Sequence, residues 1–372
     1  MGVAYTPGLR VTAEAAIRRV RRLPLKGQVL VAAGQTVAAE TVVARAEMPG
    51  ILHTVRAAQS LHIEPQELAP ALVKQPGEQV QAGDLIAETK GLLGLFRSQL
   101  RSPVSGTMEE VSAVSGHVRI RERPRVVELP AYIAGTVAEV IEGEGAVIEA
   151  RGALVQGIFG VGGERWGRLR LVAKSPDETL SAEALGECAG CVLVGGAGAD
   201  GRAIGAAAEA GATGLVVGAV SDGALREYLG YDIGVAITGQ EQVPMTLILT
   251  EGFGELAMAR RTWELLASLD GQLASINGAT QIRAGVIRPE IVVTRDGRPA
   301  GEAVSEPEQV LVVGSRVRLI REPHFGQLGR VTALPVEPTE IETESKVRVA
   351  MVELDGGGEV RVPRANAEIV QE

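Results

Sequence analysis

A short strand, a glycine turn and a second short strand recur in the first half of the chain, and this repetition constrains the fold more than any other feature. One version covers residues 26–44 and returns at residues 76–87. A second version, in which glycine precedes an alternating strand, covers residues 49–55, 102–111 and 134–140. Hairpins of this length cannot bury an apolar face alone, so they must fold over one another. The repeats therefore predict a β-rich region of packed hairpins.

The length and composition of the chain limit its architecture and its partners. At 372 residues the chain exceeds what one core usually organises, so several domains are expected. Only 3% of the residues are aromatic although 45% are hydrophobic, so the cores must be built from Val, Leu, Ile and Ala. The formal charge of −9 argues against a general grip on a phosphate backbone, which needs a basic surface. No stretch of about 18 or more uncharged apolar residues occurs, so no membrane insertion is expected.

The two cysteines, Cys188 and Cys191, are spaced as CxxC. They close an expected helix at residues 181–187 and open an expected strand at residues 191–194, whereas a redox pair normally opens a helix. No second Cys or His pair lies nearby to complete a zinc site, so neither a metal nor a cofactor is expected. We expect two buried thiols, with redox or metal chemistry as the alternative. Two cysteines also exclude a disulfide framework and favour a cytoplasmic location.

One pair of repeats resembles a known family. The runs PGEQVQAGDLIAE (residues 76–88) and SPVSGTMEEV (residues 102–111) are similar to the barrel-sandwich hybrid of biotinyl and lipoyl domains. The resemblance implies a lysine at an exposed hairpin that carries a prosthetic group, and Lys90 stands at that position. The Met or Asp residues that flank a carrier lysine are missing, and an insertion follows at residues 92–100, so a relative without the modification is favoured. The apolar start of the insertion either packs on a neighbouring repeat or forms an exposed contact patch.

Strands alternate with helices in the middle of the chain, from about residue 171. This alternation predicts a mostly parallel sheet with right-handed crossovers. The expected helices cover residues 181–187, 202–210, 222–229 and 255–268, and the expected strands cover residues 191–194, 214–217, 234–238 and 246–250.

Ligands of parallel sheets bind beyond the carboxyl ends of the strands. The loop that contains Gly195, Gly196 and Gly198 precedes an expected helix, whose N-terminus favours an anion. Thr250 and Glu251 end another strand. These five residues are the candidates for ligand binding, and a structural or interaction role for this region is the favoured alternative. The glycine spacing is not the GxGxxG of dinucleotide-binding loops.

The C-terminal residues 323–331 read PHFGQLGRV and follow an alternating strand. This segment resembles the KOW motif of SH3-like barrels, except that Glu322 stands where the motif has glycine. The resemblance implies a barrel over residues 310–372 that contacts RNA or protein. The candidate contact residues are Arg316, Arg318, Arg321, His324 and Arg330. The region holds eight Lys or Arg against ten Asp or Glu, and it lacks aromatics for stacking bases, so a protein partner is favoured and RNA is the alternative.

The sequence as a whole predicts a multidomain, β-rich protein with barrel-sandwich hybrid repeats, an α/β domain with a mostly parallel sheet, and a C-terminal SH3-like β-barrel. The expected parts are an N-terminal segment (1–22), a barrel-sandwich hybrid-like β region (23–168), the α/β domain (169–300), a linker (301–309) and the KOW barrel (310–372). The favoured function is a non-enzymatic adaptor or assembly protein that binds a macromolecular partner. The alternatives are an RNA- or transcription/translation-associated binding protein acting through the KOW barrel, and an enzyme accessory or prosthetic-group carrier. The pattern specifies neither the identity of the partner nor the oligomeric state.

Overall fold

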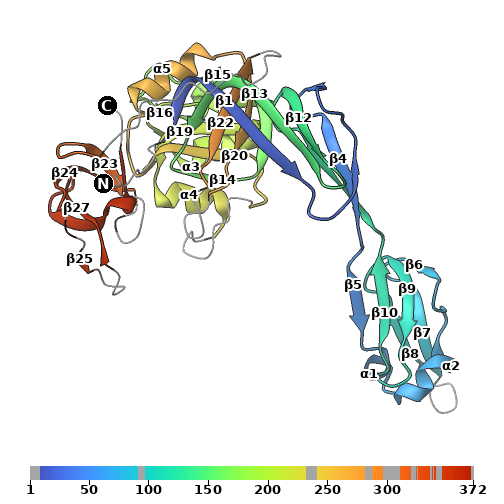
Figure 1. The fold of residues 1–372 in the computed structure, drawn as a ribbon. Helices are drawn as coiled ribbons and strands as arrows, with labels where there is room; N and C mark the ends of the chain where they lie inside the picture. The colour runs from blue at the N-terminus through green and yellow to red at the C-terminus, as the bar shows by residue number, and fades with distance from the viewer. Residues whose placement is uncertain are drawn as a thin grey trace.

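A computed structural model describes residues 9–90, 97–231, 241–280, 287–295, 311–319, 324, 326–335, 337, 339–340 and 346–369. The protein is rich in β-structure and contains several separate sheets. Its parts lie along an arch (Figure 1), with a small C-terminal unit at one end, a large central unit in the middle and a β lobe at the other end. No helix among these residues is both long and apolar enough to span a membrane.

The central unit is built on the largest sheet, which has 13 strands. Its main path runs in the order β14 (Phe159–Val161), β20 (Thr246–Phe253), β19 (Gly214–Val220), β17 (Cys191–Val194), β15 (Glu164–Leu171), β21 (Leu273–Asn277), β22 (Glu290–Arg295), β13 (Gly145–Gln156), β12 (Gly135–Ile141) and β3 (Thr36–Val37). The other three strands are β1 (Val11–Arg22), which pairs with β13, and the short strands β16 (Thr179–Leu180) and β18 (Gly198–Ala199). The adjacent strands β15, β17, β19 and β20 run parallel to one another. Strand β13 pairs antiparallel with β1, β12 and β22.

Helices cover both faces of the parallel strands. Helices α3 (Gly201–Glu209) and α4 (Asp222–Leu229) pack on one face, and α5 (Arg260–Ser268) packs on the other. Strand β19 shows why, because Leu215 and Val217 join the core under α3 and α4 whereas Val216 joins the core under α5. Each face of the sheet is therefore apolar, as expected for strands buried on both sides.

Several sequence-based elements differ in extent from those observed. The helix expected at residues 181–187 is a single 3-10 turn, η3 (Ala182–Ala184), because Gly186 adopts a positive φ of 60° and breaks the helical path. The helix expected at residues 255–268 begins only at Arg260. The helix expected at residues 222–229 is confirmed as α4, whereas the strand expected at residues 234–238 lies outside the described residues.

Two of the part boundaries suggested by the sequence can be compared with the strands, because those at residues 300–310 lie outside the described residues. The boundary after residue 22 falls at the end of a strand, and the one after residue 168 falls inside a strand. Residues 11–22, taken as a terminal segment, form β1, which pairs with β13 from Val11 to Arg22. Residue 168 lies inside β15, in the middle of the 13-stranded sheet.

A second sheet, the shoulder, joins this body to the lobe and consists of β11 (Arg125–Pro130), β4 (Val42–Met48) and β2 (Gln28–Val29).

The distal lobe, residues 50–123, has a core of its own. Its four-stranded sheet contains β5 (Leu52–Val55), β10 (Val118–Glu122), β9 (Gly106–Val111) and β6 (Gln79–Val80), and a hairpin of β7 (Leu85–Lys90) and β8 (Arg97–Arg101) lies beside it. The lobe also contains α1 (Ala57–Leu61), η1 (Pro65–Glu67) and α2 (Leu68–Ala71). The residues of its hydrophobic cluster, among them Leu68, Ile86 and Ile120, all come from the lobe itself.

A narrow neck of two chain segments connects the lobe to the shoulder. Gly50 lies so close to the other segment that a Cβ there would stand 1.9 Å from the carbonyl oxygen of Glu122. The segments are also joined by a hydrogen bond from the Glu122 N–H to the Ile51 carbonyl (3.0 Å) and by contact between His53 Nε2 and the Glu122 carboxylate (2.8 Å). Only glycine fits this crossing, which explains the glycine of the second repeat.

The C-terminal unit has a five-stranded antiparallel sheet. Its order is β28 (Glu359–Pro363), β27 (Val349–Leu354), β24 (Leu328–Ala333), β23 (Arg316–Leu319) and β29 (Ala367–Ile369). The 3-10 turn η4 (Arg364–Asn366) leads into β29, and a two-stranded ribbon of β25 (Thr339–Glu340) and β26 (Lys346–Val347) extends from the sheet. Its core, which includes Val317, Val331 and Val352, contains only residues of this unit.

Candidate functional site

The glycine loop after β17 is filled by the protein's own backbone. A Cβ on Gly196 would lie 2.4 Å from the carbonyl oxygens of both Ser175 and Glu178. The Gly195 N–H donates to the Val216 carbonyl (2.8 Å), so it is not available to a ligand. A Cβ on Gly198 would lie 2.9 Å from another backbone oxygen. Close packing accounts for these glycines, in place of the anion cradle that the sequence suggested.

The helix that follows this loop already has an anion at its N-terminus. The Asp200 side chain accepts a hydrogen bond from the Ala203 N–H at 2.7 Å and caps α3. A carboxylate at this position satisfies the free amide groups and the positive end of the helix dipole. The amide groups and the dipole of the helix N-terminus, which would favour an external anion, thus interact with the protein's own Asp200 side chain.

The end of β20 carries the other two ligand candidates, and both are buried. Thr250 is 2% exposed, and its hydroxyl donates to the Val217 carbonyl at 3.4 Å. The Glu251 carboxylate accepts a hydrogen bond from the Ala259 N–H (3.0 Å) through one oxygen and from Arg318 (2.8 Å) through the other. Glu251 is therefore fully engaged by the chain, with a guanidinium as its partner.

Arg318 is therefore not an exposed contact residue. The sequence predicts an outward contact residue on β23, but its side chain is 1% exposed and points into the junction between the C-terminal unit and the central unit. A buried guanidinium paired with Glu251 cannot reach a phosphate or a partner protein in this arrangement. The side chains of β23 do alternate between two faces, but the central unit covers the face that the sequence assigned to solvent.

A second ion pair lies beside the first. Arg288, just before β22, donates to Glu368 of β29 at 2.6 Å, and Glu368 lies 4.0 Å from Arg318. Burial raises the pKa of Glu368 and lowers the pKa of Arg288, in each case against the opposing effect of the partner charge. Burial thus acts on both groups in the direction that disfavours their charged forms. Neither Arg288 nor Glu368 had a sequence signal, because they lie on different units and their pairing is not local.

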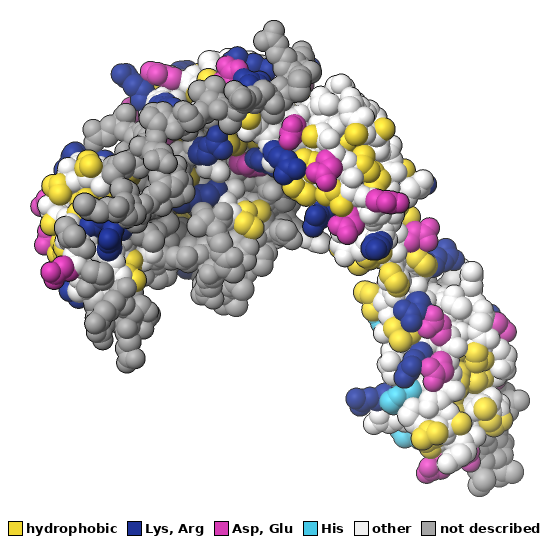
Figure 2. Space-filling view, in the orientation of Figure 1, with side chains coloured by type: hydrophobic (Ala, Val, Ile, Leu, Met, Phe, Trp, Pro, Cys, Tyr) yellow, Lys and Arg dark blue, Asp and Glu magenta, His cyan; other side chains and the backbone are white. Residues whose placement is uncertain are grey.

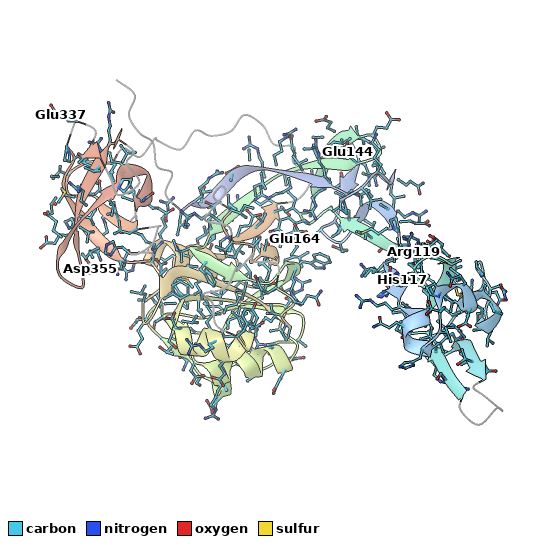
Figure 3. The ribbon with its side chains drawn as sticks, turned by 90° about the horizontal axis from the view of Figure 1, so that it is seen from below. His117, Arg119, Glu144, Glu164, Glu337 and Asp355 are labelled. Carbon is cyan, nitrogen blue, oxygen red and sulfur yellow. The ribbon has the colours of Figure 1, made fainter. Side chains whose placement is uncertain are left out.

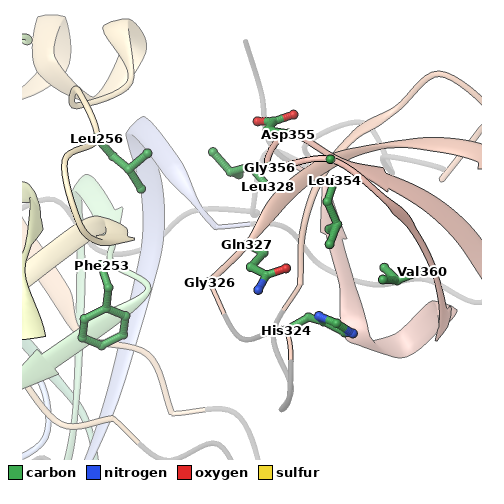
Figure 4. A pocket seen from close by; sticks show the side chains of 11 residues that line it. Phe253, Leu256, His324, Gly326, Gln327, Leu328, Leu354, Asp355, Gly356 and Val360 are labelled. Atoms are coloured by element: carbon green, nitrogen blue, oxygen red, sulfur yellow. The ribbon is translucent and has the colours of Figure 1, made fainter.

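A cleft of about 710 Å³ separates the two units next to these pairs (Figure 4). Phe253 and Leu256 line it from the central unit, and Leu354, Val360 and His324 line it from the C-terminal unit. Phe253 is held by a tilted contact with the Phe159 ring, at 5.0 Å between centroids. The wall from the central unit is apolar, whereas the wall from the C-terminal unit also contains Gln327 and Asp355, and His324 is the predicted contact residue that faces the cleft.

The remaining predicted contact residues do not form one basic surface. Arg316 is paired with Asp355, with an Nη1–Oδ1 distance of 2.7 Å, and Arg330 is exposed and donates to the Gly314 carbonyl at 3.0 Å. Arg321 lies outside the described residues. Asp355 marks this end of the molecule in Figure 3, far from the lobe residues His117 and Arg119.

A partly buried polar cluster around the buried Tyr132 lies on the shoulder side of the body. The Tyr132 hydroxyl donates to Glu290 (3.2 Å), and Arg19 of β1 donates to the same carboxylate oxygen at 2.9 Å. Arg21 binds Glu164 through two hydrogen bonds of 2.7 and 2.6 Å. Burial raises the pKa of Tyr132, so its hydroxyl remains a donor. These contacts tie β1 to β15 and β22 and are structural.

The distal lobe presents a surface of balanced charge. Residues 50–123 contain eight Lys or Arg and eight Asp or Glu. Arg119 pairs with Glu110 at 2.9 Å and Arg121 with Glu109 at 2.5 Å, and Figure 2 shows blue and magenta side chains side by side on this face. The lobe therefore has no net positive charge, whereas binding to nucleic acid needs a basic surface.

Lys90 lies at the end of β7, where the β7–β8 hairpin opens, and it pairs in register with Arg97. The hairpin belongs to the part of the lobe remote from the neck in Figure 1. The apolar segment at residues 92–96, expected to pack or to form a contact patch, lies outside the described residues, and so do the rest of the residues between the two strands.

The two cysteines are free thiols with different exposure. Cys188 is 1% exposed, whereas Cys191 is partly buried at the start of β17. Burial, reinforced by the neighbouring Cys191, raises the pKa of the Cys188 thiol. Within the described ranges, no three His, Cys, Asp or Glu side chains come together as a metal site would require.

Comparison of the chain with protein-family models and with curated proteins finds no match.

Proposed function

We propose that the protein is a non-enzymatic adaptor that binds a protein partner through its distal lobe. The observation that carries the proposal is the separation of the lobe from the body, since it has its own core and is held on a neck of only two segments (Figure 1). A folded module projected in this way can be reached from several sides without disturbing the central sheet. Its resemblance to the barrel-sandwich hybrid, a fold of protein modules, supports the same function.

The surface of the lobe favours a protein over RNA. Val114, in the turn between β9 and β10 at the end remote from the neck, is 92% exposed. Ile51 at the neck is 55% exposed. These are single apolar side chains at opposite ends of the lobe, within a surface of balanced charge. A protein interface can combine such side chains with a polar surround, whereas a nucleic-acid surface needs an excess of cations.

Affinity purification with two forms of the protein tests the proposal. The first form is the full chain, and in the second a short Gly-Ser turn replaces residues 52–121. Leu52 and Arg121 are directly paired across β5 and β10, so a tight turn closes this gap without strain on the shoulder. We expect the full chain to capture a partner that the shortened chain does not. Equal capture by both forms would show that the lobe is not the binding module.

A single substitution locates the contact within the lobe. We expect Val114→Asp to weaken capture, because it places a charge at the exposed tip. Val126→Asp is the matched control, since Val126 is 58% exposed but lies on β11 of the shoulder. Loss of capture with the control alone would move the interface to the shoulder.

A second candidate function, prosthetic-group carrier, is favoured by the place of Lys90. The lysine that ends β7 stands where a carrier lysine stands in the family that the lobe resembles. The intact mass of the protein from its native host tests this function, with Lys90→Arg as the control. An added mass that disappears in the variant would support it, and an unmodified mass rejects it.

The alternative of RNA binding through the C-terminal unit loses its most central residue with the burial of Arg318. Retention of the protein on RNA at low salt, weakening steeply as salt rises, would restore this alternative.

A further inference from the structure

The junction between the central and C-terminal units contains a reciprocal set of charges. The central unit contributes Glu251 and Arg288, and the C-terminal unit contributes Arg318 and Glu368. Each unit therefore provides one anion and one cation, and each is bound by the opposite charge of the other unit. We propose that this four-residue clamp is a releasable latch that holds the C-terminal unit closed over the carboxyl end of β20.

The geometry makes the clamp specific for one orientation. The Arg318–Glu251 contact is 2.8 Å and the Arg288–Glu368 contact is 2.6 Å, while Arg318 and Glu368 stand 4.0 Å apart. The side chains of Arg318 and Glu368 are each 1% exposed. A rotation or slide of one unit would bury at least one charge without its partner, which is strongly unfavourable. The closed arrangement is thus well defined.

Among the residues that the structure describes, the two units do not share a hydrophobic core that would oppose release. The hydrophobic cluster of the C-terminal unit contains no residue of the central unit, and the clusters of the central unit contain none of its residues in turn. Phe253 and Leu256 face Leu354 and Val360 across the cleft of about 710 Å³ instead of packing into one core (Figure 4). For the described part of the chain, apolar burial therefore contributes less at this junction than within the core of either unit.

Two charged side chains of the clamp would gain hydrogen bonds if the junction opened. Arg318 Nε and Glu368 Oε2 are buried without a hydrogen-bond partner among the described residues. Water would satisfy both atoms once the units separate. Desolvation offsets much of the attraction within a buried ion pair, so the closed form is only weakly favoured while both pairs are intact, and it is lost when one buried charge has no partner.

Opening would change what both units display. The end of β20 would expose Glu251 and Phe253, and β23 would expose Arg318. An acidic segment of a partner could then bind Arg318, in the place that Glu251 occupies in the closed form. The latch is independent of the function proposed for the lobe.

Three variants of the full chain test the latch. Glu251→Gln and Arg318→Gln each leave one buried charge without its partner, whereas the double variant removes both charges and leaves the Arg288–Glu368 pair balanced. We expect each single variant to open the junction and the double variant to close it again. A purely steric role for these side chains predicts the opposite, with the double variant the most open.

Small-angle X-ray scattering and hydrogen exchange provide the readouts. In each single variant we expect a larger maximum dimension and about tenfold or more faster exchange in peptides that cover residues 250–259. Arg316→Gln is the control, because its partner Asp355 lies in the same unit, and it should match the wild type. Circular dichroism verifies folding, and Arg288→Gln breaks the second pair if Glu251→Gln does not fold. Unchanged scattering and exchange in the folded single variants, or a double variant more open than either, would overturn the proposal.

Discussion

Removing one partner of a buried ion pair lowers the free energy of unfolding far more than removing one partner of an exposed pair. Arg318, whose side chain is 1% exposed, belongs to the buried kind. We expect Arg318→Met to destabilise the closed form by about 3–5 kcal/mol, because Glu251 and Glu368 would be buried there with too little positive charge, and opening of the junction to relieve part of this loss. Arg316→Met, whose partner Asp355 is about half exposed, should cost less than about 1 kcal/mol. Urea denaturation of both variants measures the difference, and equal losses would contradict the burial of Arg318.

Two glycines of the central unit should respond to alanine in opposite directions. Gly196→Ala places a Cβ 2.4 Å from two carbonyl oxygens and should destabilise the protein by about 1–3 kcal/mol. Gly205→Ala, inside α3 with open space around it, should stabilise the protein by roughly 0.5–1 kcal/mol. Thermal unfolding of the two variants reports both signs. A stable Gly196→Ala variant would mean that the loop is open and able to receive a ligand.

The two thiols should differ in reactivity. A raised pKa means that less of the Cys188 thiol is ionised at pH 8 than of an ordinary thiol, and the thiolate is the reactive form. Because Cys188 is also 1% exposed, we expect iodoacetamide to modify Cys191 and to leave Cys188 intact in the folded protein. Mass spectrometry of the peptides checks this, with protein unfolded in urea as the control in which both thiols react. Rapid alkylation of Cys188 in folded protein would be inconsistent with its burial.

Among the secondary-structure elements, α5 shows how one amphipathic helix supports the sheet. Leu266 is fully buried under the sheet whereas Glu264 is exposed on the same helix. Leu266→Ala should lower the free energy of unfolding by about 2–5 kcal/mol, since it removes buried apolar atoms and leaves a cavity. Glu264→Ala should stay within about 0.5 kcal/mol of the wild type in urea denaturation. Similar effects of the two changes would mean that α5 does not pack as described.

The hydrophobic periodicity of the sequence predicted those strands and helices in which the local residue pattern agrees with the packing in the structure. The strand at residues 191–194 was predicted with its bounds, and the strands at residues 214–217 and 246–250 were predicted but extend to Val220 and Phe253. The expected helix at residues 181–187 was wrong because Gly186 turns the chain, and the one at residues 255–268 was too long. Met258 and Ala259 donate their N–H groups to Pro176 and Glu251, which holds that segment outside the helix.

The candidate sites were less predictable than the elements, for a physical reason. Glu251 and Arg318 were each selected as charged residues near a strand, but their pairing depends on how two units dock. Likewise, β13 and β22 pair across a long stretch of chain that carries no local signal for it. Burial of Arg318 and docking of the units are properties of tertiary structure, and no pattern within one strand reveals them.

At the scale of the whole molecule, the lobe is the part with the clearest independence. Its hydrophobic cluster is complete without the body, and a core of this size gives a modest stability of about 3–5 kcal/mol. We expect residues 50–123, produced alone, to unfold cooperatively, and the shortened chain without residues 52–121 to retain the unfolding transition of the body. Circular dichroism on heating measures both. A lobe that is unfolded alone would show that the shoulder stabilises it.

The most direct measurement of the central claim is competition for the partner between the full chain and the isolated lobe. The partner captured by the full chain is challenged with an excess of folded lobe, residues 50–123, and with an excess of the same lobe carrying Val114→Asp. The account predicts that the wild-type lobe releases the partner and that the variant lobe releases much less. A folded wild-type lobe that releases none of the partner, even in excess, would contradict the claim that the projecting lobe is the binding module.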